Sequence, residues 1–171
     1  SIGDNIFGLK IAGYAPGFDR YGKKNDGLIK EACALADKAE VSLVYLGLDE
    51  VTEAEGLDRG DIKIPQAQID LVDALAKKGK KIVVVLSCGS AVELPFADKV
   101  DAIVHAYLGG QAIAEAVLDV IVGKVNPSGK LAESYPYEYK DCSSASHFPG
   151  KQRSVEYREG MFVGYRYYDT A

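Results

Sequence analysis

Six carboxylates lie within thirteen residues of this sequence, in the segment Asp49-Glu50-Val-Thr-Glu53-Ala-Glu55-Gly56-Leu-Asp58-Arg59-Gly60-Asp61. We call residues 49–61 the acidic segment. Only one arginine accompanies the carboxylates, so they cannot all be paired as charges on a helix surface. The Asp-x-Asp-x-Asp-Gly spacing of a calcium loop is missing, which argues against a metal site. The spacing alone leaves two alternatives open, a solvated acidic loop and a ligand site.

The position of the acidic segment bears on that choice. The segment directly follows Val41–Gly47, a β-rich run that ends in glycine and is predicted to be a strand. We therefore expect the segment to lie at the carboxyl end of a parallel strand. Ligand sites in open α/β sheets gather at that edge.

Other motifs with a recognised chemistry are missing. No Gly-x-Gly-x-x-Gly follows a strand, no Walker-type Gly-Lys-Ser/Thr is present, and Gly89-Ser90 lacks the rest of a Gly-x-Ser-x-Gly turn. The three cysteines are Cys33, Cys88 and Cys142, and no two of them stand at metal-ligand spacing. We predict that Cys33 and Cys88 are small core residues and that His105 is a histidine of the core or of a strand end.

Short apolar runs alternate with helical periods along the chain. Strands are predicted at residues 41–47, 82–86 and 102–107, and helices at 28–39, 65–78 and 109–123. This alternation is typical of a parallel sheet covered on both faces. We therefore expect residues 1–171 to form a single α/β domain. Its architecture is predicted to be a three-layer α/β/α sandwich with a mostly parallel sheet that could include one antiparallel edge strand.

The two ends of the sequence are less regular. Residues 10–14 are predicted to be a further strand, and residues 160–168 alternate apolar and polar side chains as a strand does. Residues 124–160 are rich in Pro, Gly, Ser and Tyr and have no period, which predicts a long surface excursion. Such excursions are often functional or contact another domain.

Composition argues against several kinds of partner. The chain carries a net charge of −5 and has a pI near 5.1, which disfavours nucleic acid and anionic membranes. The sequence has no apolar run of about 18 residues and no signal-peptide pattern. We expect no membrane association and favour a cytoplasmic location.

The order of motifs along the chain resembles the second domain of glycoside hydrolase family 3, the β-glucosidase and β-xylosidase group. The matching motifs are Leu46-Gly47-Leu48, Glu55-Gly56-Leu57-Asp58-Arg59, Ile64-Pro65 with Gln68, residues 83–86 with Gly89-Ser90, Gly110-Gln111, residues 123–131 and residues 162–169. Each motif alone is weak, but this many in one order are specific.

The resemblance implies a retaining, exo-acting β-glycosidase that hydrolyses β-linked glycosides with two domains. A (β/α)-barrel would supply an aspartate nucleophile, and this sandwich would supply the general acid/base. The acid/base of similar proteins falls on the Glu-Gly-x-Asp-Arg motif, hence on Glu55, with Glu53 as the nearest competitor. Asp58 and Arg59 are candidate substrate-binding residues, although Arg59 could instead clamp a neighbouring carboxylate. The barrel is absent from these residues, so the chain is interpreted as part of a larger enzyme, and no metal or cofactor is implied.

The chemistry of retaining hydrolysis agrees with this assignment. It requires two carboxyl groups about 5–5.5 Å apart, one as nucleophile and one as acid and then base. The acid must hold a proton near neutral pH, which burial or nearby negative charge favours. Glu53, Asp58 and Asp61 could provide such charge, and Gly56 would allow a tight turn that directs Glu55 outward.

Two interpretations of other classes remain. The chain could be a non-catalytic relative that serves as a scaffold or sugar-binding module, which would not co-purify with a barrel carrying the nucleophile. It could also be a flavodoxin-like ligand-binding domain, although the missing phosphate loop disfavours this.

Overall fold

Three parallel strands form the sheet, in the order β1 (Val41–Gly47), β2 (Lys81–Ser87) and β3 (Ala102–His105). The computed structural model describes residues 8–150, 153 and 155–170. Val44 pairs with Val84, and Val84 with Ile103, so these three side chains share one face of the sheet. The middle strand is the apolar run that the sequence predicts to be buried on both faces.

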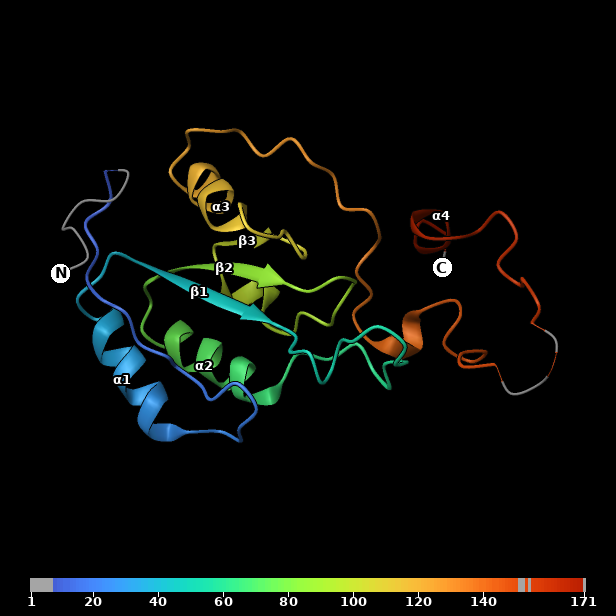
Figure 1. Cartoon of the computed structure of the whole chain (residues 1–171), viewed down its shortest axis with the longest axis horizontal. Coiled ribbons are helices and arrows are strands. Elements are labelled where there is room, and N and C mark those ends of the chain that lie inside the picture. Colours follow the sequence, from blue (N-terminus) through green and yellow to red (C-terminus); the bar gives the residue numbers. More distant parts are fainter. Residues whose placement is uncertain (1–7, 151–152, 154, 171) are drawn as a thin grey trace.

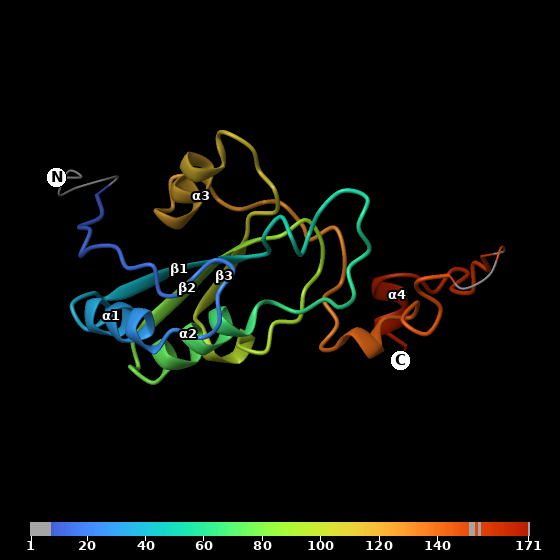
Figure 2. The same cartoon turned by 60° about the horizontal axis from the view of Figure 1, so that its bottom comes forward.

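Helices lie on both faces of the sheet. α1 (Asp26–Ala36) and α2 (Gln66–Ala76) cover one face, and α3 (Ile113–Ile121) lies on the other (Figures 1 and 2). α1 begins at Asn25, whose side chain accepts hydrogen bonds from the amides of Gly27 and Leu28. The predicted three-layer α/β/α sandwich is confirmed, with helix bounds that differ by a few residues from those expected.

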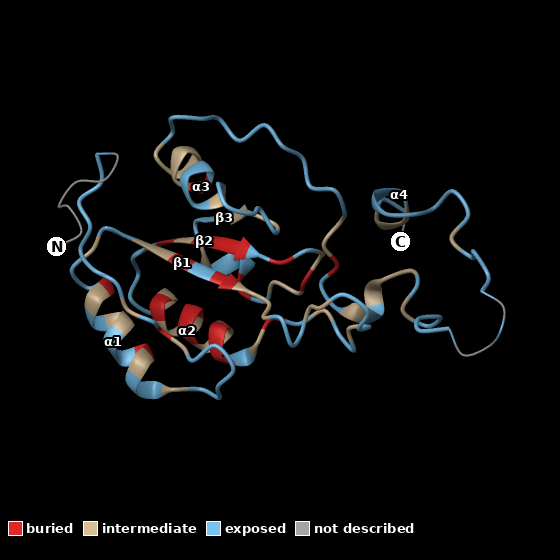
Figure 3. Cartoon of the chain, viewed as in Figure 1, coloured by how far each residue is buried: buried red, intermediate tan, exposed pale blue. Residues whose placement is uncertain are grey.

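The main core lies between the sheet and the pair α1 and α2 (Figure 3). Its most buried members are at most 1% exposed: Val72, Ile82, Val84, Leu86, Cys88, Val92 and Phe96. Cys88 belongs to the same core, as predicted, and Cys33 packs against it. This side of the sheet therefore provides the rigid base from which the strands project their carboxyl ends.

The opposite face of the sheet is covered only in part. Val117 of α3 and Val85 of β2 are buried there, whereas Tyr45 of β1 is 55% exposed. β1 is also an edge strand of the sheet that the described residues form. The domain is thus well packed on one side of the sheet and open at the β1 end of the other.

The strand predicted at residues 10–14 is wrong. This segment runs over the helices instead, with Gly13 against Leu35 of α1 and Gly17 against Leu71 of α2. Among the described residues it has no neighbouring strand with which to pair, and a strand without a partner leaves its backbone groups to water.

The strand predicted at residues 160–168 is also wrong. The segment forms turns and the short helix α4 (Tyr165–Tyr168), beyond the carboxyl ends of the strands (Figure 1). Gly160 and Gly164 have φ values of +58° and +60°, which interrupt an extended backbone. The antiparallel edge strand that the sequence allowed is therefore not found among the described residues. Residues 124–150 follow an irregular path, as expected, with one 3-10 turn at Tyr139–Asp141.

Gln68 of α2 holds the end of β1 in place. Its amide group accepts a hydrogen bond from the Gly47 N–H at 2.9 Å and donates one to the Gly47 carbonyl at 2.8 Å. Among the residues described, Gln68 is the one buried polar residue of the core, and it is 5% exposed. Gly47 itself must lack a side chain, because a Cβ there would lie 2.2 Å from the Ser87 carbonyl oxygen. The point from which the acidic segment leaves the sheet is therefore fixed by α2 and β2 together.

We expect Gln68→Ala to lower the free energy of unfolding by about 2 kcal/mol or more, because it leaves two backbone groups of Gly47 without partners. Urea unfolding followed by circular dichroism measures this change. Gln66→Ala is the matched control in the same helix, since Gln66 is exposed and bonds only to Asp70. Its effect should stay within about 0.5 kcal/mol. Equal effects of the two substitutions would contradict the role of Gln68.

Candidate active site

The acidic segment begins with a turn built around Asp49. Asp49 Oδ1 accepts hydrogen bonds from the amides of Val51 at 3.0 Å and Thr52 at 2.8 Å. These bonds, with that to Thr52 the stronger, hold the pKa of Asp49 below its usual value. The segment contains no helix or strand, so such local bonds determine its path.

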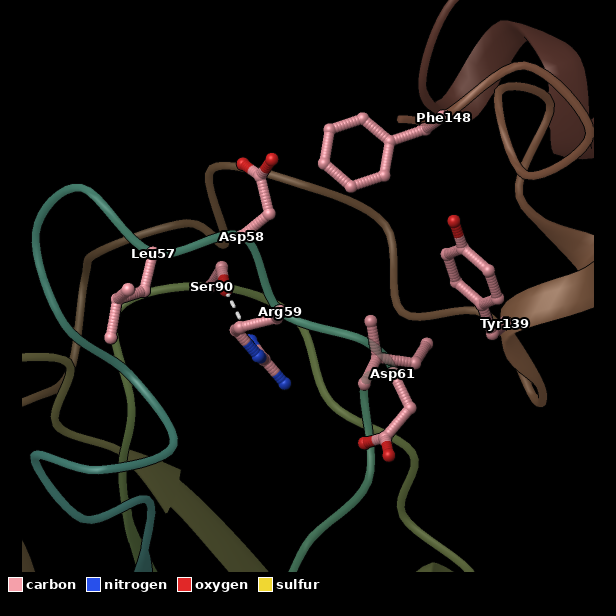
Figure 4. Close-up of a pocket in the computed structure, with 8 residues that line it drawn as sticks. Leu57, Asp58, Arg59, Asp61, Ser90, Tyr139 and Phe148 are labelled. Carbon is pink, nitrogen blue, oxygen red and sulfur yellow. Dashed lines mark hydrogen bonds between the residues drawn. The ribbon is translucent and has the colours of Figure 1, made fainter. Parts of the chain in front are cut away.

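Glu53 attaches the segment to the exit of β2. Its Oε2 accepts a hydrogen bond from the Gly89 amide at 2.9 Å, and its Oε1 lies 3.5 Å from Ser90 Oγ. Arg59 Nη1 donates to Ser90 Oγ at 2.7 Å (Figure 4). The same nitrogen lies 3.9 Å from Glu53 Oε1. The Glu53 and Arg59 side chains are 20% and 15% exposed. We call Glu53, Gly89, Ser90 and Arg59 the Glu53 anchor, and it joins the exit of β1 to the exit of β2.

Glu55 lies on a tight turn two residues beyond this anchor. The Leu57 amide donates to the Ala54 carbonyl at 3.3 Å, and Gly56 has a φ of +79°, as the third residue of a type II turn requires. Glu55 is exposed, at the carboxyl edge of the sheet where the sequence predicts it. Within the part of the chain that the structure describes, its carboxylate has no hydrogen bond or ion pair.

The other carboxylates of the acidic segment divide into bonded and unbonded groups. Glu50 binds Arg20 and Tyr21, and the hydrogen bond from Tyr21 contributes most to a lowered pKa of Glu50. Asp61 accepts a hydrogen bond from the Lys63 amide at 2.8 Å.

Only Glu55 and Asp58, of the six carboxylates, have no bonded partner among the described residues. A carboxylate free of internal bonds can bind or exchange a proton with a ligand without breaking the fold. The geometry therefore separates these two side chains from the four that shape the segment.

Asp58 borders a pocket of about 300 Å³ next to the Glu53 anchor. The lining includes Leu57, Arg59 and Ser90 from the two exits, and Tyr139 and Phe148 from the irregular C-terminal segment (Figure 4). Nε and Nη2 of Arg59 are buried and have no partner among the described residues. The pocket thus places a carboxylate opposite aromatic side chains, with a guanidinium at its base.

Two further observations limit the chemistry. Among residues 8–150, 153 and 155–170, no group of three or more His, Cys, Asp or Glu side chains could hold a metal ion. None of the helices within these same residues is long and apolar enough to cross a membrane.

Some residues next to the site are not identified by sequence motifs. His105 ends β3, as predicted, and burial lowers its pKa. Cys88 lies beside it, and burial raises the pKa of this thiol to about 11, which keeps the thiol protonated near neutral pH. Tyr107 and Tyr135 pack on His105, and neither belongs to a motif that could have identified it.

Comparisons with known proteins identify the family. The sequence profile of the Glycosyl hydrolase family 3 C-terminal domain matches residues 10–165. The chain is 49% identical over 154 residues to a thermostable beta-glucosidase B of Acetivibrio thermocellus, across 88% of this chain and 20% of that protein. It is 44% identical over 165 residues to an exo-alpha-(1->6)-L-arabinopyranosidase of Bifidobacterium breve, across 95% of this chain and 22% of that protein.

Solved structures agree. The fold is similar to that of the GH3 beta-glucosidase of Bifidobacterium adolescentis, with a TM-score of 0.85 and 47% identity across 91% of this chain and 23% of that one. It is also similar to a beta-glucosidase of Kluyveromyces marxianus in complex with glucose, with a TM-score of 0.80 and 35% identity across 86% and 18%. This chain therefore belongs to glycoside hydrolase family 3, as its C-terminal domain, and the resemblance seen in the motifs is confirmed. It spans about a fifth of the length of the curated relatives it matches.

The two glutamates of the turn should differ sharply in their effect on stability. Glu53→Ala removes the acceptor of the Gly89 amide and leaves Arg59 without its carboxylate, so we expect a loss of about 2 kcal/mol. Glu55→Ala removes an exposed side chain without bonds and should change the free energy of unfolding by less than about 0.5 kcal/mol. Urea unfolding of the two variants measures the difference. A Glu55→Ala variant as unstable as Glu53→Ala would mean that Glu55 belongs to the structural contacts.

Proposed function

We propose that this chain supplies the general acid/base, Glu55, to a retaining, exo-acting β-glycosidase. The observation that carries the proposal is the arrangement of two glutamates in a family 3 chain. Glu53 is bound in an anchor, whereas Glu55 lies two residues away on an exposed turn and has no bonded partner among the described residues. A group that must give up and regain a proton in each cycle needs that freedom.

The proposed reaction has two steps. In the first, Glu55 donates its proton to the oxygen of the leaving group while a nucleophilic carboxylate attacks the anomeric carbon. In the second, Glu55 takes a proton from the water that displaces the sugar from the enzyme. The two carboxyl groups would stand about 5–5.5 Å apart across the scissile bond.

The nucleophile is proposed to come from a (β/α)-barrel of the same enzyme. Relatives that are about five times longer than their match to this chain support a further domain. A barrel placed over the carboxyl edge would cover the turn of Glu55, and removal from water penalises the charged carboxylate. The protonated acid would therefore be favoured where the two domains meet.

Asp58 and Arg59 are proposed to act in different ways. Asp58 borders the pocket and has no bonded partner among the described residues, which suits contact with a sugar hydroxyl. Arg59 lies in the Glu53 anchor and supports the turn from below. The identity of the sugar is proposed to be decided outside this domain. Relatives named as a beta-glucosidase and as an arabinopyranosidase match the chain at 49% and 44% identity.

The isolated 171-residue chain should not hydrolyse nitrophenyl glycosides measurably, because it lacks the proposed nucleophile. Release of nitrophenolate, followed by absorbance, measures this. Robust turnover by the pure chain would contradict the division of the site between two domains.

In an enzyme that joins this chain to a barrel, Glu55→Ala should slow the hydrolysis of disaccharides by roughly 10²–10⁴-fold. Aryl glycosides with an activated nitrophenolate should suffer far less, because that group leaves without a proton. Azide should restore turnover and yield a glycosyl azide, since it needs no base to attack the accumulated glycosyl-enzyme.

Glu53→Ala is the matched control, and it should show no azide rescue, because the Glu55 carboxylate remains to act as acid and base. Rescue that follows Glu53 instead would move the acid/base by two positions. The absence of rescue in both variants would favour a non-catalytic scaffold or sugar-binding module.

A further inference from the structure

A cluster of aromatic and titratable side chains lies next to Gly89, where β2 and β3 end. His105 is the last residue of β3, and its Nε2 lies 3.9 Å from the Sγ of Cys88, the first residue after β2. The His105 ring stacks on that of Tyr107, with centroids 3.7 Å apart and planes 12° from parallel. The Tyr135 ring meets the same imidazole edge-on at 5.6 Å. None of these side chains has a part in the proposed reaction.

Tyr107 has an unusual backbone conformation. Among the described residues it is the one non-glycine residue with φ in the left-handed region, at +52°. This conformation costs roughly 1–2 kcal/mol, so the surroundings must hold it. The Tyr107 amide donates to His105 Nδ1 at 3.1 Å, and the Tyr107 hydroxyl accepts from the Ala132 amide at 3.2 Å. His105 therefore contributes both an acceptor and a stacking surface to the strained residue.

The strained residue leads directly to the Glu53 anchor. A Cβ built on Gly89 would lie 3.2 Å from Leu108 Cδ1 and 3.1 Å from Glu53 Oε1. The side chain that follows Tyr107 thus packs against the same glycine whose amide binds the Glu53 carboxylate. The backbone conformation of Tyr107 therefore determines the position of the Leu108 side chain against Gly89.

We propose that His105 is a positioning residue for the acid/base turn. Its neutral imidazole holds Tyr107 in the left-handed conformation, and Tyr107 sets Leu108 against Gly89. The Gly89 amide is thereby fixed in the place where it binds Glu53, two residues before Glu55. The kinetic consequence rests on the proposed function, whereas the structural consequence does not.

The protonation state of His105 matters because only a neutral ring has an acceptor at Nδ1. Burial lowers the pKa of His105, an effect that outweighs the opposing contributions of a β2 carbonyl and the Glu133 charge. The titratable groups that face the ring are Cys88, Tyr107, Tyr135 and Glu133. Burial raises the pKa values of the Cys88 thiol and the Tyr135 hydroxyl, so both are neutral at pH 7.

The sign of the pH dependence follows from this shift. The unfolded chain binds the imidazole proton more readily than the folded chain. The contribution of His105 to stability is therefore present above about pH 6.5 and is lost as the pH falls below that value.

The structural part is tested by NMR on the 171-residue chain, with the Gly89 amide proton as the reporter. In the wild type this proton should resonate downfield, because it is bonded to a carboxylate. It should also shift, together with the Tyr107 amide, as acid protonates His105. His105→Ala should remove at least half of the downfield displacement at pH 7. His105→Asn should retain it, because Asn Oδ1 can take the place of Nδ1, and should lack the pH-dependent step.

Val104→Ala is the matched control, since it truncates the preceding residue of β3 and leaves the imidazole intact. It should keep the Gly89 signal even if the chain becomes less stable. The proposal is overturned if folded His105→Ala keeps the wild-type Gly89 shift. It is also overturned if Val104→Ala loses that shift as well.

The kinetic part uses an enzyme that joins this chain to a barrel. There His105→Ala should lower kcat for a disaccharide roughly 10–10²-fold with little change in KM, because a misplacement of about 1 Å can cost this much. His105→Asn should restore most of the rate. If the Gly89 signal responds as expected and kcat does not, the proposed function of the turn is wrong and the positioning role stands. If the Gly89 signal does not respond, the positioning role is overturned whatever the kinetics show.

Discussion

The hydrogen bond from the Gly89 amide to the Glu53 carboxylate, together with that from Arg59 to Ser90, links the acidic segment to the exit of β2. A segment without helix or strand must offset roughly 1–2 kcal/mol of backbone entropy per ordered residue with few contacts. Charge-assisted hydrogen bonds are about twice as strong as neutral ones, so a well-placed carboxylate offsets part of this cost. The turn of Glu55, the pocket beside Asp58 and the position of Arg59 all depend on it.

The site forms where the rigid ends of the strands meet the irregular C-terminal segment. The ends of β1 and β2 are held by the main core, and Gln68 extends that rigidity to the last residue of β1. The C-terminal segment brings Tyr139 and Phe148 to the same edge (Figure 4). Loops on a rigid base are the usual arrangement for a binding site, because the base sets the position and the loops set the chemistry.

Periodicity predicted the layers of the fold but not every strand. The apolar run of β2 and the helical periods have little other explanation. The alternation at residues 160–168 says only which side chains could share a face, and residues 10–14 are a short segment without a clear period. Whether a neighbouring strand is present depends on the tertiary structure, which a local sequence pattern does not encode. In the same way, the exposed turn of Glu55 could be predicted from the segment itself. The anchor of Glu53 could not, because its partner Gly89 lies 36 residues away in the sequence.

The acidic segment is flanked on both sides by residues whose main-chain groups are hydrogen-bonded to the domain. Gln68 binds both backbone groups of Gly47 at its start, and the Glu93 amide donates to the Ile62 carbonyl at 2.7 Å just after its end. Between these two points the chain crosses no element of the sandwich. A replacement for residues 49–61 taken from a relative should therefore be joined after Leu48, whose amide binds the Ser87 carbonyl, and before Ile62. It should also keep Glu53 and Arg59, which bind Gly89 and Ser90. Any graft that also changes Gly47 would force β1 and β2 apart, since the Ser87 carbonyl leaves no room for a side chain.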